Sequence, residues 1–135
     1  VVPSIFLNLE DAWKCFFFTL ILAFLNDRIV LVIKKKISRK RPSLKIMGKE
    51  NNHPDFNHSF PSAHAANSMV VASFLYFQYR NPIFLFLFLF SLFAGVGRLI
   101  TLHHFLSDII GGWIIGLIFG ILGIFIYSFW IQTLI

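Results

Sequence analysis

The chain has 135 residues, of which 57% are hydrophobic and only 13% charged, and its mean hydropathy is +0.75. An ordinary soluble domain has about half apolar and about 25% charged residues, so this composition excludes that class and predicts a membrane protein. The single cysteine, Cys15, excludes an internal disulfide and a cysteine-based metal knuckle. We therefore expect Cys15 to serve helix packing.

The first apolar segment runs from Ala12 to Ile33. A helix of this length, at ~1.5 Å per residue, can cross a hydrocarbon core of ~30 Å. Its polar interruption is the sequence NDR at residues 26–28, and charged groups inside lipid are costly unless they have a partner. We expect Asp27 to form a buried ion pair with Lys34 or Arg98.

The rest of the chain contains one polar stretch and three further apolar segments. Residues 34–60 are basic and carry proline and asparagine turn signals, which predicts an extramembrane loop. The apolar segments that follow cover residues 61–79, 83–100 and 109–135. Together they predict an all-α fold, a polytopic membrane helix bundle of about four transmembrane helices with one long polar loop.

Local signals refine the predicted helices. We expect Ser62 to cap the second helix and Pro82 to lie at or near the first residue of the third. In the last segment Gly112, Gly116 and Gly120 recur every four residues. Small residues at this spacing share one helix face, so we expect them to allow close packing of a neighbouring helix.

The order of the helices places the candidate polar groups at one membrane face. If each segment crosses once, the loops at 34–60 and 100–108 emerge on the same side. That side gathers cations, histidines and one acid, namely Lys34, Lys35, Lys36, Arg39, Lys40, Arg41, Lys45, Lys49, His53, His58, His64, Arg98, His103, His104 and Asp108. Several fixed cations, together with the N–H groups of a helix start, are suited to bind phosphate. This face therefore predicts an anion site.

Histidine adds reactivity to such a site. Its unperturbed pKa lies near neutrality, so it can act as a nucleophile or as a general acid. His104 and Asp108 are four residues apart, and a helix that begins near Phe105 would place them on one face. The carboxylate could then orient the imidazole.

Three stretches resemble the signature motifs of the type 2 phosphatidic acid phosphatase family. They are KKKISRKRP at residues 34–42, PSAH at 61–64 and RLITLHHFLSD at 98–108. The family patterns are K, six residues, R-P; then P-S-G-H; then S-R, five residues, H, three residues, D, and every spacing fits. Two positions depart, since Ala63 replaces the usual glycine and Gly97 the usual serine. Gly97 thereby removes a hydroxyl donor to phosphate.

The resemblance also implies an architecture. Membrane members of the family typically have six spanning helices, so we expect this chain, as a single membrane phosphatase domain over residues 1–135, to lack the first two. The loop at 34–60 is then the active-site loop. The usual placement of bacterial members implies the inner membrane with an extracytoplasmic active site, whereas the basic loop alone would favour the cytoplasm.

The resemblance implies a membrane lipid phosphatase that forms a phosphohistidine intermediate without a metal or other cofactor. His104 would be the nucleophile, Asp108 would hold its other ring nitrogen, and His64 would protonate the leaving oxygen. The phosphate-binding residues it implies are Lys34, Arg41, Ser62, Ala63 through its backbone, and Arg98. The partners would be a lipid phosphate and the bilayer, not nucleic acid. The similarity of FPSAHAANS, residues 60–68, to bacterial members favours a polyprenyl diphosphate or lipid A as the substrate.

Other residues of this face have simpler expected roles. We expect His53 and His58 to be solvated and His103 to be interfacial. The remaining basic side chains are expected to meet lipid headgroups or solvent, and these are Lys35, Lys36, Arg39, Lys40 and Lys45.

Two other functions remain open from the residues. One is a metal-dependent hydrolase, since histidine and carboxylate suit zinc. Its ligands would come from His53, Asp55, His58, His64 and His104. The other is a non-catalytic binder or transporter of anionic lipids.

Overall fold

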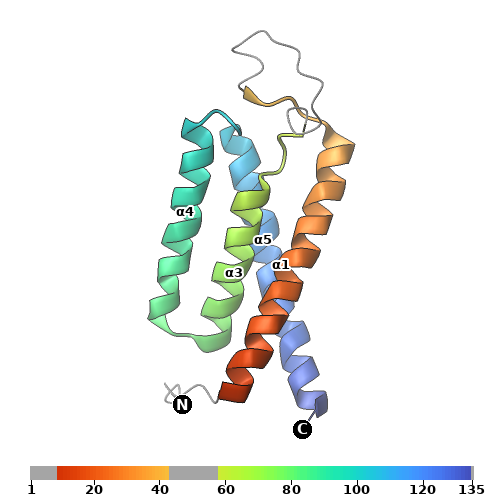
Figure 1. Cartoon of the computed structure of the whole chain (residues 1–135), viewed down its shortest axis with the longest axis vertical. Helices are drawn as coiled ribbons and strands as arrows, with labels where there is room; N and C mark the ends of the chain where they lie inside the picture. Colours follow the sequence, from red (N-terminus) through yellow and green to blue (C-terminus); the bar gives the residue numbers. More distant parts are fainter. Residues whose placement is uncertain (1–8, 43–57, 135) are drawn as a thin grey trace.

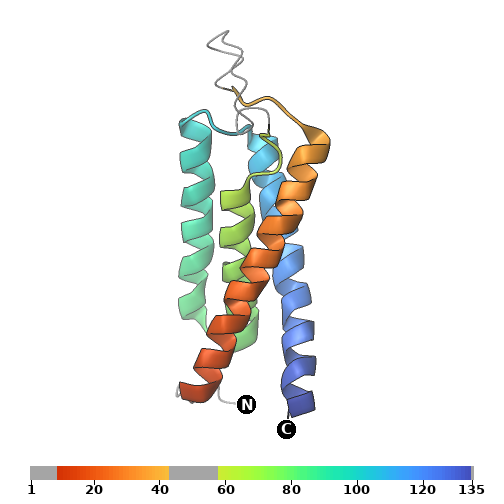
Figure 2. The same cartoon turned by 45° about the vertical axis from the view of Figure 1, so that its right-hand side comes forward.

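The computed structural model describes residues 9–42 and 58–134. Four long helices run alternately up and down (Figure 1). They are α1 (Leu9–Ile37), α3 (Ala63–Tyr79), α4 (Leu85–Ile100) and α5 (Leu106–Leu134), with a short 3₁₀ helix, η2 (Pro82–Phe84), before α4. The described part of the chain is thus all-α, as the sequence predicts. The view turned by 45° also shows the helices running side by side along the long axis of the molecule (Figure 2).

Helix α1 is longer than its apolar stretch. Glu10 and Asp11 lie in its first turn and three lysines, including Lys34, in its last, which is the charge order that the helix dipole favours. The helix ends at Ser38, whose φ of 48° is left-handed and whose N–H donates to the Lys34 carbonyl over 2.9 Å. The expected loop boundary at residue 34 is therefore wrong, because Lys34 belongs to the helix.

Helices α3 and α4 begin where the sequence predicts. The Ser62 side chain caps α3 by accepting from the Ala65 N–H over 3.4 Å. Pro82 takes the first position of η2, where its missing N–H costs nothing, and Asn81 caps that turn. Between the two helices the chain turns at Arg80, whose φ of 48° places it in the left-handed region.

Helix α3 lies at the centre of the bundle, and it packs most extensively on α5. Its buried face is made of small and medium side chains such as Ala66 and Val70, both fully buried. The predicted close contact of the α5 glycines is confirmed, since a Cβ at Gly112 or Gly116 would collide with the α3 backbone. This close approach places the start of α3 against the start of α5.

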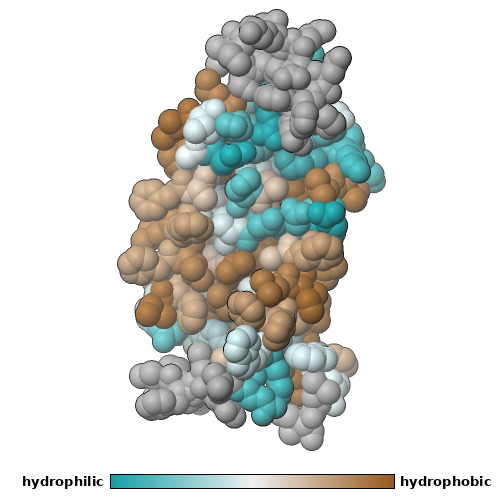
Figure 3. Space-filling view, viewed as in Figure 1, coloured by the Kyte–Doolittle hydropathy of each residue, from teal (hydrophilic) through white to brown (hydrophobic). Residues whose placement is uncertain are grey.

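The outer surface of the bundle is apolar. Large exposed side chains such as Phe86, Phe93 and Phe125 project from α4 and α5. On the face seen in Figure 3 hydrophobic residues form a wide belt across the middle of the molecule, crossed on one side by a strip of polar residues. By length and composition α1, α4 (with η2) and α5 could cross a membrane, whereas α3, with 17 residues, is shorter. The apolar helices indicate a membrane protein.

Polar residues inside the belt form their own network. The Asn26 amide donates to Asn67 over 2.7 Å, and the Asn67 amide donates to Asp27 over 3.2 Å. Asp27 pairs with Arg28 at 2.8 Å, so the expected ion pair with Lys34 or Arg98 is wrong. The Asp27 carboxylate binds its neighbour Arg28 and, on the facing turn of α3, Asn67. Both are nearer to it than Lys34, which lies in the last turn of α1.

At the opposite end of the bundle the core is aromatic. Cys15 is buried with Leu22, Phe74 and Tyr127, which confirms its packing role. Phe74 and Tyr127 meet edge to face with ring centroids 5.6 Å apart. This cluster ties α1, α3 and α5 together far from the polar end.

Candidate active site

The polar end of the bundle contains a cavity of about 440 Å³ between α1, α3, α4 and the connecting loops. Its lining combines cations, histidines and two apolar residues, namely Leu31, Lys34, Lys35, Arg41, His58, Ala63, His64, Arg98 and His104. The last turns of α1 and α4 and the first turns of α3 and α5 lie at this end of the bundle (Figure 1). Residues from all three sequence motifs therefore line one pocket. The predicted single-sided arrangement is what the fold produces.

His104 lies in the short loop between α4 and α5 and is only 2% exposed. Its Nδ1 atom is 3.7 Å from Oδ2 of Asp108, and it has no hydrogen-bond partner among the described residues. Burial lowers the pKa of His104, and the cations Arg41 and Lys34 lower it further, while Asp108 opposes them. The imidazole is thus held in its neutral form near pH 7.

Asp108 lies in the first turn of α5, is fully buried, and does not line the pocket. Its Oδ2 atom accepts from the Phe105 N–H over 2.7 Å and from the Ser59 hydroxyl, and its Oδ1 atom accepts from Arg39 Nη1 over 2.9 Å. The bond to Phe105 is the back-capping half of a capping box. It begins α5 at Leu106, three residues earlier than the hydrophobic pattern alone predicts.

Lys34 and His58 hold each other through their backbones. The Lys34 ammonium donates to the His58 carbonyl over 3.0 Å, and the His58 Nδ1 atom lies 3.1 Å from the Lys34 carbonyl. The expectation that His58 is solvated is therefore wrong, since it is half-buried and lines the pocket. His53, the second histidine expected to be solvated, lies outside the described residues, as do Asp55, Lys45 and Lys49.

The start of α3 supplies two pocket residues and one buried cap. Ala63 and His64 line the pocket, but Ser62 is fully buried and does not. The Ser62 N–H donates to the Asp108 carbonyl over 2.9 Å, and its hydroxyl serves the helix start. Its contribution here is to join α3 to α5, which sets His64 and His104 in the same cavity.

Two basic residues lie closer to the site than expected. Arg39, expected at headgroups or in solvent, pairs with the buried Asp108 and stacks on the Phe105 ring, with its guanidinium carbon 4.3 Å from the ring centroid. Lys35 is exposed and also lines the pocket. Residue order along the sequence does not reveal the Arg39 contact, because its partner is 69 positions away.

Four further residues complete the description of this end. Arg41 lines the pocket and donates to the His103 carbonyl over 3.2 Å, and Arg98 lines it from the last turn of α4. The His103 side chain is exposed and outside the pocket lining, with Nδ1 2.9 Å from the Thr101 hydroxyl. A Cβ added at Gly97 meets no atom within 4 Å, so the position has room for a side chain.

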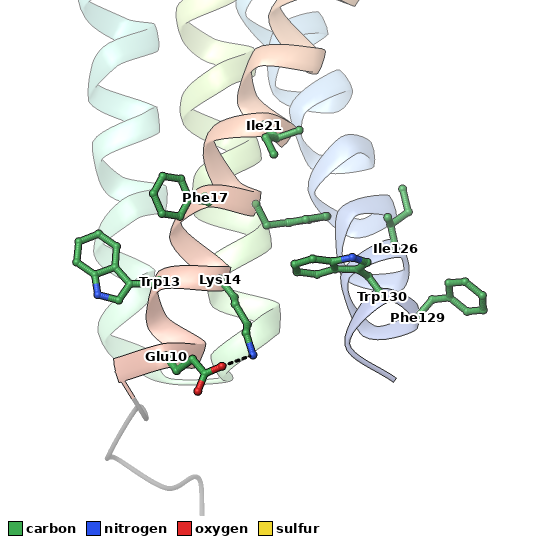
Figure 4. Close-up of a pocket in the computed structure, with 9 residues that line it drawn as sticks. Glu10, Trp13, Lys14, Phe17, Ile21, Ile126, Phe129 and Trp130 are labelled. Atoms are coloured by element: carbon green, nitrogen blue, oxygen red, sulfur yellow. Dashed lines mark ion pairs between the residues drawn. The ribbon is translucent and has the colours of Figure 1, made fainter. Parts of the chain in front are cut away.

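A larger groove of about 710 Å³ lies at the other end of the bundle, between α1 and α5. Figure 4 shows Ile21 on α1 and Trp130 on α5 turned toward the space between the two helices, whereas Phe17 projects from the opposite side of α1, and the Glu10–Lys14 ion pair lies at the helix end. That ion pair measures 3.0 Å and is the polar part of an otherwise apolar lining. The residues that line this groove include no histidine, in contrast to the smaller pocket.

Fold and site together define a helical membrane protein with a cationic, histidine-containing pocket at one end of its bundle. The model of the PAP2 superfamily matches residues 12–132, and the chain belongs to that superfamily. No curated protein and no solved structure matches it. Membership gives the protein a phosphatase-type activity, the hydrolysis of a phosphoester.

Proposed function

We propose that the protein hydrolyses the phosphate monoester or diphosphate of a membrane lipid through a phosphohistidine on His104, without a metal. The observation that carries this proposal is the orientation of His104. Its Nδ1 atom faces the Asp108 carboxylate at 3.7 Å while its ring lines a pocket rich in cations. With the proton on Nδ1, the opposite nitrogen Nε2 has the lone pair that a nucleophile needs.

The proposed reaction has two steps. Nε2 of His104 attacks phosphorus, the bond from phosphorus to the lipid oxygen breaks, and His64 gives its proton to that oxygen. Water then attacks the phosphorus of the phosphohistidine and His64 takes a proton from the water. The bond from phosphorus to Nε2 breaks, its electron pair returns to His104, and inorganic phosphate leaves. Lys34, Arg41 and Arg98 line the pocket and would stabilise the charge on the phosphoryl oxygens in both steps.

The position of the pocket supports a lipid substrate. His64 lies on the first turn of α3, in a bundle whose helices α1, α4 and α5 expose large apolar side chains. A lipid could therefore lay its chains along these helices while its phosphate enters the pocket. A lipid carries its phosphate at the boundary between polar and apolar surroundings. A polyprenyl diphosphate and lipid A phosphate are the substrates we would assay first, followed by phosphatidic acid and phosphatidylglycerol phosphate.

Phosphate release by the purified protein in excess EDTA tests this function. We expect release from at least one lipid phosphate in that panel at equal surface fraction, since the fixed cations supply the charge that a metal would otherwise supply. Loss of all activity with EDTA and recovery with zinc would support a metal-dependent hydrolase. No release from any lipid, with or without metal, would support an anionic-lipid binder or transporter.

We propose a bacterial inner-membrane location with the pocket on the extracytoplasmic side. Three cations of the basic run, Lys34, Lys35 and Arg41, line the proposed phosphate site, which offers a reason for their presence other than a cytoplasmic loop. A cysteine at exposed Lys36, in a Cys15→Ser background, should react with an impermeant thiol reagent in intact spheroplasts. A cysteine at Arg80, at the other end of α3, is the matched control and should react only after lysis. The reverse pattern would invert the orientation.

A further inference from the structure

Two side chains outside the three motifs converge on Asp108. Arg39 precedes residues 43–57 and Ser59 follows them, and the Ser59 N–H donates to the Arg39 carbonyl over 2.8 Å. Both side chains then bind the Asp108 carboxylate, Arg39 at Oδ1 and Ser59 at Oδ2. Residues from both sides of the long loop are therefore fastened to the first turn of α5 through one buried acid.

We propose that Arg39 and Ser59 are positioning residues that restrain the Asp108 carboxylate and limit its attraction for the proton of His104. His104 then stays neutral and able to attack. The catalytic part of this inference rests on the proposed function, but the restraint itself concerns only the contacts of Asp108.

The occupancy of Oδ2 is the first argument. A carboxylate oxygen has about two lone-pair positions, and Oδ2 already accepts from the Phe105 N–H and the Ser59 hydroxyl. The Nδ1 atom of His104 is 3.7 Å from the same oxygen, beyond hydrogen-bond distance. Asp108 therefore acts on His104 by its charge more than by a direct hydrogen bond.

The charge of Arg39 is the second argument. Its Nη1 atom is 2.9 Å from Asp108 Oδ1 and 2.6 Å from the Ser107 hydroxyl, and its guanidinium is stacked on Phe105. These three contacts fix a positive charge beside the carboxylate, which offsets much of the negative field that reaches the imidazole. Fixing the guanidinium on Phe105 keeps that compensation in place.

The groups that face His104 come from every element around it. Besides Asp108 of α5, the charged and titratable groups that share the pocket with His104 are Lys34 and Lys35 of α1, Arg41 and His58 of the first connection, His64 of α3 and Arg98 of α4. All except Asp108 are basic. Asp108 is therefore the only described side chain among these that can raise the proton affinity of His104, and the groups that bind Asp108 control how strongly it does so.

The test is the pKa of His104, measured by NMR of histidine-labelled full-length protein in micelles, without substrate. Arg39→Gln removes the compensating charge, so we expect the His104 pKa to rise by about 0.5 to 1, less than a directly adjacent charge produces. Ser59→Ala frees one position on Oδ2 for the imidazole and should also raise it. Arg39→Lys and Ser59→Thr keep the charge and the hydroxyl, and should leave it close to the wild-type value.

Activity supplies the second readout. In Arg39→Gln and Ser59→Ala the acid limb of kcat/KM should move to higher pH by the same amount as the His104 pKa, and most of the rate should return at high pH. Rates that fall equally at every pH, with an unchanged His104 pKa, would show that the two residues only stabilise the loop and would overturn the proposal. If Arg39→Gln does not fold, Ser59→Ala carries the same test.

The two proposals fail separately. An inactive wild-type protein whose His104 pKa still rises in Arg39→Gln supports the restraint on Asp108 and contradicts the phosphatase. An active phosphatase whose His104 pKa is the same in all four variants supports the function and contradicts the restraint.

Discussion

The Nδ1 atom of His104 lies 3.7 Å from Oδ2 of Asp108, across the junction between the 101–105 loop and the first turn of α5. The four-residue spacing predicts this proximity, but not the competition for the carboxylate. Oδ2 is engaged more closely by the Phe105 N–H, at 2.7 Å, than by the imidazole. The acid thus shapes the start of α5 and orients the histidine at the same time.

Replacing His104, the proposed nucleophile, should abolish both turnover and the proposed covalent intermediate. In His104→Ala no other described side chain has an imidazole in the pocket with a carboxylate behind it, so we expect no phosphate release and no acid-labile phosphoenzyme. His103→Ala is the matched control, because the His103 side chain is exposed and does not line the pocket. A phosphoenzyme that survives in His104→Ala would move the nucleophile elsewhere.

The pH dependence of kcat/KM should show an unusually acidic lower limb. The pKa of His104 is lowered from 6.5 by burial and by Arg41 and Lys34, and only the neutral imidazole can attack phosphorus. Activity should therefore rise with pH through a midpoint below 6.5, since kcat/KM reports groups of the free enzyme. A lipid phosphate also titrates near pH ~6, so the NMR titration of His104 must agree with the kinetic midpoint. A midpoint well above 6.5 in both measurements would contradict a neutral resting His104.

The helices and the pocket could be predicted from the sequence because their signals are local. Long apolar segments gave four helices, and the motif spacings placed Lys34, His64 and His104 at one end. Contacts between distant residues could not be predicted in this way. In the sequence Arg39 is one of several cations in a basic run, and nothing distinguishes it. In the structure it forms an ion pair with the buried Asp108 of α5 and so belongs to the candidate site.

Helix boundaries were missed for a similar reason. The start of α5 depends on the Asp108 cap rather than on hydrophobicity, and α1 continues through its three lysines because the helix dipole favours them there. The partners of Asp27 depend on which turn of α3 faces it, which no spacing within α1 reveals.

Gly97 should tolerate a serine, and the hydroxyl should help bind phosphate. The position is at the end of α4, next to the pocket residue Arg98, and has open space around a new Cβ. A hydrogen bond to a charged group contributes about 1.5–3 kcal/mol, so Gly97→Ser should raise kcat/KM by about tenfold or more. Gly97→Ala is the control for the added methyl group. Equal rates in the two variants would show that the hydroxyl does not reach the phosphate.

The α3–α5 contact should be intolerant of even one methyl group. A Cβ at Gly116 would lie 2.8 Å from the Met69 Cβ and closer still to the Ala66 carbonyl oxygen, which is backbone and cannot move aside. We expect Gly116→Ala to destabilise the protein by about 1–3 kcal/mol, as overpacking does. Gly97→Ala, in open space, should be neutral or slightly stabilising. Thermal unfolding of both variants in the same detergent compares them, and similar midpoints would mean that the two helices are less closely packed.

His64 should reveal its role through the leaving group. If His64 is the proton donor, as proposed, it is needed most when the departing oxygen is a basic alkoxide, where general acid catalysis contributes about 10²–10⁴-fold. A nitrophenolate leaves without a proton, so His64→Ala should lose far more activity on a lipid alkyl phosphate than on p-nitrophenyl phosphate. His64 lines the pocket with an exposed side chain that has no hydrogen bond or ion pair to another described residue, so the variant should fold. His64→Gln keeps the size and hydrogen bonding without the titratable proton, and it should show the same selective loss. Equal losses on both substrates in folded protein would mean that His64 binds the phosphoryl group and does not protonate the leaving oxygen.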